Sequence, residues 1–301
     1  MTRSYWMLLL LLSAVWGASY LFIKEAVQEI APATTMAIRL LVATVILHGF
    51  LFAARGVRRS VKELAAAWQP GLVLGVVNGA VPFTLIGWGE RHVDSGVAAI
   101  ANASVPIFNV LFAWNLLPRE RVTGARLGGV LLGLVGVAIL TGFHPRGDSL
   151  AVEGTLAVVL ASASYALAGI YGQGRVASIP GPVLAASSTF FGFIVLVPVA
   201  AFQLPASMPG WKATVSVLAL AVLGTAVAQL ILFRMLLLHG SARLSLVTYL
   251  LPATALVYGA LLLHEHLSVS MLAGLALILG GVAFGSGSLR WFRRPPVAQS
   301  P

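Results

Sequence analysis

Ten long apolar segments run through the 301-residue chain, separated by short polar connections. We expect membrane-spanning helices at residues 4–24, 33–54, 70–89, 95–116, 123–142, 151–173, 181–202, 213–237, 242–263 and 268–289. An α-helix needs about 20 residues to cross a hydrocarbon core about 30 Å thick. Membrane-spanning strands would alternate apolar and polar residues, whereas these segments are continuously apolar. The pattern therefore predicts an all-α polytopic membrane protein with ten transmembrane helices.

The composition favours the same class. Hydrophobic residues make up 59% of the chain and charged residues only 9%, against about 25% charged residues in a typical soluble domain. The chain has no cysteine, which excludes a disulfide framework and a thiolate metal site. The first apolar segment follows Arg3 and is longer than the core of a secretory signal peptide, so we expect it to be retained as the first span.

The basic residues predict the orientation. With a cytoplasmic N-terminus, 14 Lys and Arg residues fall on the inner side and 4 on the outer side, and Arg39 remains inside a span. Because inner connections are enriched in Lys and Arg, both termini are expected in the cytoplasm. A bacterial inner (plasma) membrane is the separate expectation for the location of the chain. The net charge of +10 thus has a topological meaning and does not indicate nucleic acid as a partner.

Two parts of the chain share the same series of residues: Ser95, Pro106, Glu120, Gly129 and Gly136 correspond to Ser241, Pro252, Glu265, Gly274 and Gly281. The offset is 146 residues up to the prolines and 145 from the glutamates onward. The series predicts two five-helix repeats at residues 1–143 and 150–290, followed by a disordered cytoplasmic tail at 291–301. Because five is odd, the second repeat enters the membrane from the opposite side, as in carriers whose halves rock around a central site.

A series near the N-terminus resembles a known family. Trp16-Gly17, Phe22, Lys24, Pro32 and Arg39, at their spacing in this chain, resemble the start of an EamA domain of the drug/metabolite transporter superfamily. The repeated Ser-Pro-Glu-Gly-Gly series resembles the end of that domain, so the likeness covers nearly the whole chain. Within the superfamily the chain looks most like exporters of aromatic amino acids of the YddG type.

The second repeat departs from the family pattern, with Tyr165-Ala166 in place of Trp-Gly and Ser188 in place of the arginine. The resemblance implies two inverted repeats around a cavity lined mainly by the first, third, fourth, sixth, eighth and ninth spans. The residues expected to bind substrate there are Trp16, Tyr20, Asn78, Asn102, Tyr165, Gln229 and Tyr249.

The chemistry of these side chains suits a small amphipathic substrate. Amides inside a span are costly unless they face protein or water, and they could bind the ammonium and carboxylate groups of a zwitterion. Aromatic rings near mid-depth could stack on a planar substrate. Interhelical hydrogen bonds and core packing remain alternative roles for the same side chains.

Arg39 is a charged residue inside the second predicted span. A charge at that depth is costly in lipid, so the side chain needs water or a partner. In one interpretation Arg39 faces a wet cavity and attracts a carboxylate. In the other it pairs with Glu90 or Asp94 near the outer surface.

Four other residues are expected to have structural or gating roles. Pro106 and Pro252 occupy equivalent positions in the two repeats, and each removes a helical hydrogen bond, which suits either a hinge or a fixed kink. Glu120 and Glu265 are the equivalent acids, expected on opposite sides of the membrane, as an inverted pair requires.

Several mechanisms lack the residues that they need. No acid lies near the middle of a predicted span, so the sequence gives no direct evidence for proton coupling. There is no Walker A sequence, no convincing nucleophile site, and no metal-site spacing in His264-Glu265-His266, so we expect no cofactor, no metal and no enzyme activity.

The expected function is a carrier that exports small metabolites, most of all amino acids with aromatic ones favoured, by alternating access between the two repeats. Its expected partners are that small-molecule substrate and the lipid bilayer. A multidrug or cationic-dye efflux carrier, an intramembrane enzyme and a channel-like bundle are the alternatives, and the oligomeric state stays open.

Overall fold

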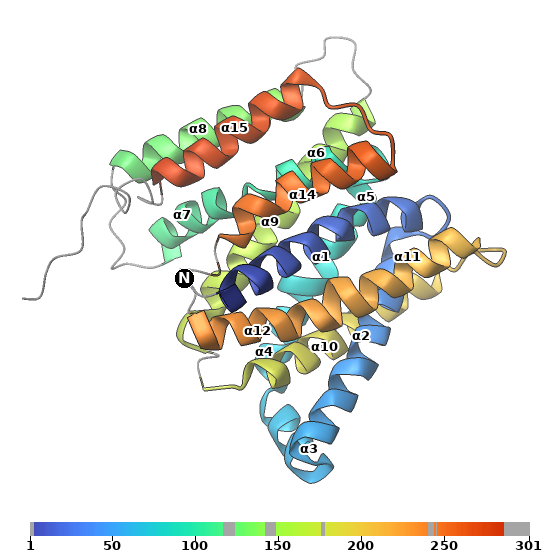
Figure 1. Ribbon diagram of the computed structural model, residues 1–301. Helices are drawn as coiled ribbons and strands as arrows, with labels where there is room; N and C mark the ends of the chain where they lie inside the picture. The colour runs from blue at the N-terminus through green and yellow to red at the C-terminus, as the bar shows by residue number, and fades with distance from the viewer. Residues whose placement is uncertain are drawn as a thin grey trace, which may run out of the picture.

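The computed structural model describes residues 3–116, 124–141, 149–175, 178–239, 244 and 246–285, and this part of the chain is helical without any strand (Figure 1). Glu120 and the tail at 291–301 lie outside the described residues. The elements are α1 (Arg3–Val27), α2 (Pro32–Arg55), α3 (Val57–Ala66), α4 (Trp68–Gly75), η1 (Val76–Ala80), α5 (Val81–Gly89), α6 (Ser95–Asn102), α7 (Val105–Leu116), α8 (Gly124–Thr141), α9 (Ser149–Arg175), α10 (Gly181–Ala201), α11 (Trp211–Ala221), η2 (Val222–Val227), α12 (Ala228–His239), α14 (Val247–Leu262) and α15 (Val269–Gly285).

The described helices confirm a polytopic membrane protein. Seven helical segments are long and apolar enough to cross a membrane, and shorter apolar helices in α8, α14 and α15 stand where the fifth, ninth and tenth spans were predicted. The third span consists of α4, η1 and α5, and the eighth consists of α11, η2 and α12. The fourth span is divided into α6 and α7.

Helix α3, between the second and third spans, was not predicted. Four of its ten residues are charged, which made this segment look like a connecting loop. Val57, Val61 and Leu64 nevertheless follow helical spacing on one face, and Leu64 packs against a core cluster that includes Leu47 and Leu51. An amphipathic helix of this kind suits the surface of a membrane.

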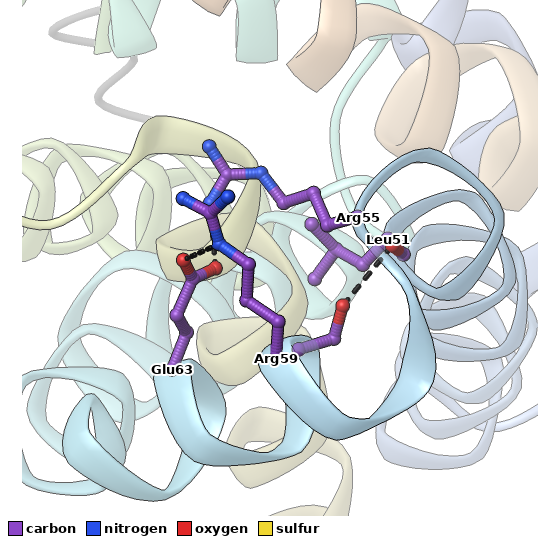
Figure 2. Close-up of polar contacts among 5 residues, drawn as sticks. Leu51, Arg55, Arg59 and Glu63 are labelled. Carbon is purple, nitrogen blue, oxygen red and sulfur yellow. Dashed lines mark hydrogen bonds and ion pairs between the residues drawn. The ribbon is translucent and has the colours of Figure 1, made fainter.

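The corner between α2 and α3 is fixed by polar contacts, which Figure 2 shows. Ser60 Oγ donates a hydrogen bond to the carbonyl of Leu51 at 3.1 Å. The carboxylate of Glu63 pairs with Arg59 at 2.8 Å and with Arg55 at 2.5 Å. Hydrogen bonds from Arg59 and then Arg55 hold the pKa of Glu63 below its usual range. This extremity of the bundle is named the Arg55 end.

Gly56 makes the turn at this corner with φ 78° and ψ 147°, a conformation that residues with a Cβ rarely adopt. We expect Gly56→Ala to lower the free energy of unfolding by about 1–2 kcal/mol. Nothing lies within 4 Å of a Cβ added at Gly56, so the backbone alone causes the loss. Thermal unfolding of the purified protein in detergent would measure it.

Gly49→Ala is the matched control, because Gly49 lies within α2 and also has nothing within 4 Å of an added Cβ. A helical glycine is less stable than alanine by about 0.5–1 kcal/mol, so this variant should gain stability. Equal effects of the two substitutions would contradict the assignment of strain to Gly56.

The packing of the spans is symmetric between the two repeats. Three contacts join equivalent spans, namely α2 with α10, α6 with α14, and α8 with α15. The other main contacts occur in symmetric pairs, each contact having a counterpart between the equivalent spans. The third span packs on the sixth, and correspondingly the eighth packs on the first. The third also packs on the seventh, and correspondingly the eighth packs on the second. Likewise, the fourth packs on the sixth as the ninth packs on the first. The fold is therefore two inverted five-helix repeats.

Helices α8 and α15 lie side by side at one edge of the bundle (Figure 1) and approach through glycines. A Cβ added at Gly136 would lie 2.9 Å from the carbonyl oxygen of Gly274, and one at Gly281 would lie 2.5 Å from that of Gly129. Gly129 and Gly136 are the repeat equivalents of Gly274 and Gly281, so the two contacts exchange under the repeat symmetry. The helices run antiparallel, as inverted repeats require.

Two π-helical segments interrupt the third and eighth spans at equivalent positions. η1 begins at Val76 and η2 at Val222, which are separated by the same 146 residues as the sequence markers before the glutamates. A π-segment widens one turn of a helix and is frequent at functional sites. Both segments contribute residues to the central cavity described below.

Candidate functional site

A cavity of about 360 Å³ lies between the two repeats. Six of the seven residues predicted to bind substrate line it: Trp16, Tyr20, Asn78, Asn102, Tyr165 and Gln229. Arg39, Pro106 and Pro252 also line it, whereas Tyr249 does not. The spans that line the cavity are those that the family resemblance implies, together with the second, through Arg39, and the seventh, through Leu184, Ala185 and Ser188.

Arg39 lies almost completely buried at the cavity wall. Its Nε donates a hydrogen bond to Thr225 Oγ1 in η2 at 2.7 Å, and its guanidinium carbon lies 3.7 Å from the centre of the Phe83 ring. The described residues include no ion pair of Arg39 with Glu90 or Asp94, so the pairing interpretation is not found. Arg39 thus presents a cation to the cavity without an acidic partner.

Among the described residues that line the cavity, Arg39 is the only charged one. The described part of the wall includes no Asp, Glu or Lys, and its other polar groups are amides, hydroxyls and one indole. A cavity with this lining favours an anionic group near Arg39 and disfavours a substrate whose only charge is positive.

Asn102 connects three helices. Its Nδ2 donates to Tyr20 Oη of α1 at 2.8 Å, and its Oδ1 accepts from Ser162 Oγ of α9 at 3.2 Å. The interhelical role weighed for this amide is therefore present, in a side chain that also faces the cavity. Because Tyr20 accepts the bond from Asn102, its own hydroxyl proton is available to a ligand.

Asn78 in η1 and Gln229 in α12 line the cavity from the two repeats. Their side-chain amides make no hydrogen bond with another of the described residues, and both are partly exposed. The amide oxygens can accept from an ammonium group, and the amide nitrogens can donate to a carboxylate. The third and eighth spans therefore each offer one free amide to a ligand.

Sequence reasoning did not identify Phe83, Ser188 and Thr225 as part of the site. Ser188 had been noted only as the residue at the position of Arg39 in the second repeat. Thr225 lies 186 residues after Arg39, and nothing in the local sequence indicates their contact. Phe83 could have been found as the aromatic residue that follows Pro82 in the third span.

The cavity reaches the surface at the Arg55 end of the bundle. Leu184 and Thr248 line it within the first turns of α10 and α14, and Thr248 is exposed. On the opposite side its lining ends at Ile23 and Ile86, each about one turn before the end of its helix. We name that opposite extremity the Lys24 end.

Contacts between separate elements close the Lys24 end. Lys24 Nζ donates to the carbonyls of Glu90 and Val93 at 2.7 and 2.8 Å. The carboxylate of Glu265 accepts bonds from the backbone and hydroxyl of Ser95 and from the backbone of Gly96, which joins the second repeat to the first. Glu265 is therefore a contact at the closed end of the cavity and not part of its wall.

The equivalent prolines have different surroundings. Pro106 follows a break in the fourth span, where α6 ends at Asn102 and α7 begins at Val105, whereas Pro252 lies inside the continuous helix α14. The two repeats therefore differ locally at equivalent positions. Among the described residues no group of three or more His, Cys, Asp or Glu side chains could hold a metal ion, and His264 and His266 belong to no such group.

Comparison with known proteins bears on the whole bundle. The EamA-like transporter family matches residues 4–142 and 152–286. A probable amino-acid metabolite efflux pump of Escherichia coli K12 is 25% identical over 301 residues, which covers 97% of each chain. An uncharacterized transporter of Archaeoglobus fulgidus is 23% identical over 277 residues, 92% of this chain and 96% of the relative.

A solved crystal structure aligns with a TM-score of 0.66 over 98% of this chain and 100% of its own, at 20% identity, and supports the fold alone. The names of these relatives do not mention aromatic amino acids, so that specificity remains a prediction. The two family matches fall on the two symmetric halves of the bundle, and the two relatives, matched over nearly their full length, are named a transporter and an efflux pump. This multi-pass membrane protein belongs to the EamA-like transporter family.

Proposed function

We propose that this transporter exports amino acids, with aromatic ones favoured, by alternating access between its two repeats. The observation that carries the proposal is a cavity in which Arg39 is the only charged residue of the described lining. An amino acid presents a carboxylate, an ammonium group and a side chain, and the cavity offers a group suited to each. The proposal assigns the protein a transport role and no catalytic step.

Each group of an amino acid has a chemically suited side chain in the cavity. The guanidinium of Arg39 suits a carboxylate, because charge-assisted hydrogen bonds to arginine are strong and directional. The free amide oxygens of Asn78 and Gln229 suit the ammonium group, and the rings of Trp16 and Tyr165 suit a planar side chain. The cavity volume of about 360 Å³ lies within the range of about 300–1,000 Å³ of small-molecule sites.

A cationic dye or drug is the nearest alternative, and the lining disfavours it. Arg39 repels a ligand whose only charge is positive, and no acid among the described lining residues offsets that repulsion. The Escherichia coli relative is named an amino-acid metabolite efflux pump, which supports amino acids as the class.

The direction of transport follows from the orientation that the basic residues predict. That orientation puts the Arg55 end in the cytoplasm and the Lys24 end outside. The cavity would then be open to the cytoplasm and closed to the outside, ready to accept a substrate for export. Both chain termini would be cytoplasmic.

The test is flux in reconstituted liposomes. We expect saturable counterflow of labelled L-phenylalanine, faster than that of L-alanine, and present without a pH gradient. Protein-free liposomes and labelled ethidium are the controls. Absence of saturable flux for every amino acid in a broad panel would overturn the proposal, and saturable ethidium flux in its place would favour the dye carrier.

A further inference from the structure

Glu90 lies where the closed Lys24 end meets the central cavity. It is the first residue after α5, and Ile86, one helical turn earlier, lines the cavity. On α1 the same relation holds between Lys24 and Tyr20, which also lines the cavity. Glu90 and Lys24 therefore occupy the layer that separates the cavity from the surface at this end.

The carboxyl group of Glu90 is buried and has no partner. Its side chain is 0% exposed, and neither carboxyl oxygen has a hydrogen-bond partner among the described residues. Lys24 lies close by, yet its ammonium donates to the backbone carbonyls of Glu90 and Val93. The neighbouring acid Glu265 differs, because its carboxylate accepts three hydrogen bonds from Ser95 and Gly96.

An ionised carboxylate in this position would lose its hydration and receive no hydrogen bond in return. Burial accordingly raises the pKa of Glu90 well above its ordinary value, and the nearby Lys24 offsets only part of that rise. The neutral carboxylic acid avoids the loss of hydration. While the Lys24 end is closed, the surroundings of Glu90 therefore favour its protonated, neutral form.

The charged groups around Glu90 do not reverse the preference of its carboxyl group for the neutral form. The groups that act on Glu90 are Lys24 and Tyr20 of α1, Arg39 of α2 and Glu265 after α14. Arg91, next in the chain, donates to the carbonyls of Val27 and Ile30. The other titratable groups near this connection are Asp94, the exposed Glu153 of α9, and His92. The ring of His92 is tilted against that of Trp88, with the ring centres 4.7 Å apart.

We propose that Glu90 is a proton-binding site, occupied when the Lys24 end is closed and emptied when that end opens. This inference rests on the alternating access of the proposed function. Opening would separate Lys24 from the two carbonyls, and water together with the freed ammonium would then reach the carboxyl group. The proton leaves to the outer solution on opening and returns from it on closing.

The site regulates the carrier and moves no net charge. Within the described part of the chain no side chain hydrogen-bonds to the Glu90 carboxyl group, so no relay leads from it to Tyr20 and Asn102 at the cavity. A group whose pKa is higher in the closed state favours closure below its open-state pKa, and that support is lost as pH rises through its closed-state pKa. Alkaline outer solution therefore opens the Lys24 end.

Cysteine labelling tests this without any substrate. The chain has no cysteine, so Val93→Cys provides a single buried thiol at the Lys24 end, and Gln28→Cys provides an exposed one. A membrane-impermeant maleimide is added outside proteoliposomes, and the labelling rate of Val93→Cys is divided by that of Gln28→Cys. This ratio cancels the intrinsic pH dependence of the reaction of a thiol with maleimide. We expect this ratio to rise between about pH 5 and about pH 9, by about tenfold for each unit by which the closed-state pKa exceeds the open-state value.

Glu90→Gln keeps the shape of the side chain and removes its titration, so the ratio should become independent of pH. A ratio that rises equally in both backgrounds would assign the titration to another group and overturn the proposal. A flat ratio with Glu90 in place would overturn it even if the glutamine variant failed to fold. Proton flux in step with substrate would also overturn it, because the proton would then cross the membrane.

Discussion

Arg39→Gln is expected to weaken binding of a carboxylate-bearing substrate about 10- to 100-fold, because a hydrogen bond to a charged group contributes about 1.5–3 kcal/mol. No other described residue of the cavity wall is charged, so no neighbour among them can replace the charge of Arg39. The measurement is the concentration dependence of L-phenylalanine counterflow in proteoliposomes. Arg39→Lys should recover part of the affinity, since it keeps the charge and loses the planar fork.

A second probe separates binding from folding. L-phenylalaninamide has the ring and the ammonium group of phenylalanine and lacks the carboxylate. The protein with Arg39 should prefer phenylalanine over the amide, and Arg39→Gln should lose that preference. Thr225→Val removes the hydroxyl that holds Arg39 Nε and leaves the charge in place, so its effect should be smaller. An unchanged preference in Arg39→Gln, with less folded protein, would show that Arg39 serves only to join α2 and η2.

The apolar pattern was sufficient for the spans because the thickness of the bilayer fixes the length of each helix. The paired glycines and prolines were sufficient for the repeat, and the structure places the four glycines at the α8–α15 contact. Helix α3 was missed because its high content of charged residues is typical of a connecting loop as well as of a helix at a membrane surface. Length and periodicity therefore predicted the bundle, and composition alone misled at its edge.

The cavity wall was harder to predict in detail, because the side of a helix that faces a cavity depends on tertiary packing. In the ninth span Thr248, Leu251 and Pro252 line the cavity at helical spacing. Tyr249 is rotated about 100° from Thr248 around the helix axis and does not line it. Because Thr248 and Tyr249 are adjacent and both carry a hydroxyl, the sequence of this helix does not show which of the two faces the cavity.

The π-segments also had no local signal. η1 has the sequence VVNGA and η2 the sequence VLGTAV, and neither contains a proline. Their equivalence became visible only once the repeat offset could be applied to the structure. The burial of Glu90 also had no local signal, because Lys24 of α1, which donates to the Glu90 carbonyl, lies 66 residues away in the sequence.

Gly281→Leu is expected to lower the free energy of unfolding by about 3 kcal/mol, the upper range for overpacking a close contact. The added Cβ would lie 2.5 Å from the carbonyl oxygen of Gly129 and 2.8 Å from the backbone nitrogen of Gly133, and neither backbone can move without separating α8 from α15. In lipid the association of helices depends on such close approach, because there is no hydrophobic driving force between them.

Gly280→Leu is the matched control, one residue away, since only Leu132 Cδ2 comes near an added Cβ there, at 3.9 Å. Thermal unfolding in detergent and protease resistance of the α8–α15 pair would compare the two variants. Among the described residues none from α8 or α15 lines the central cavity, so Gly281→Leu should lower stability more than it lowers the substrate affinity of the folded fraction. Equal destabilisation by both variants would mean that α8 and α15 tolerate separation, and that the repeated glycines are not what joins the two repeats at this edge.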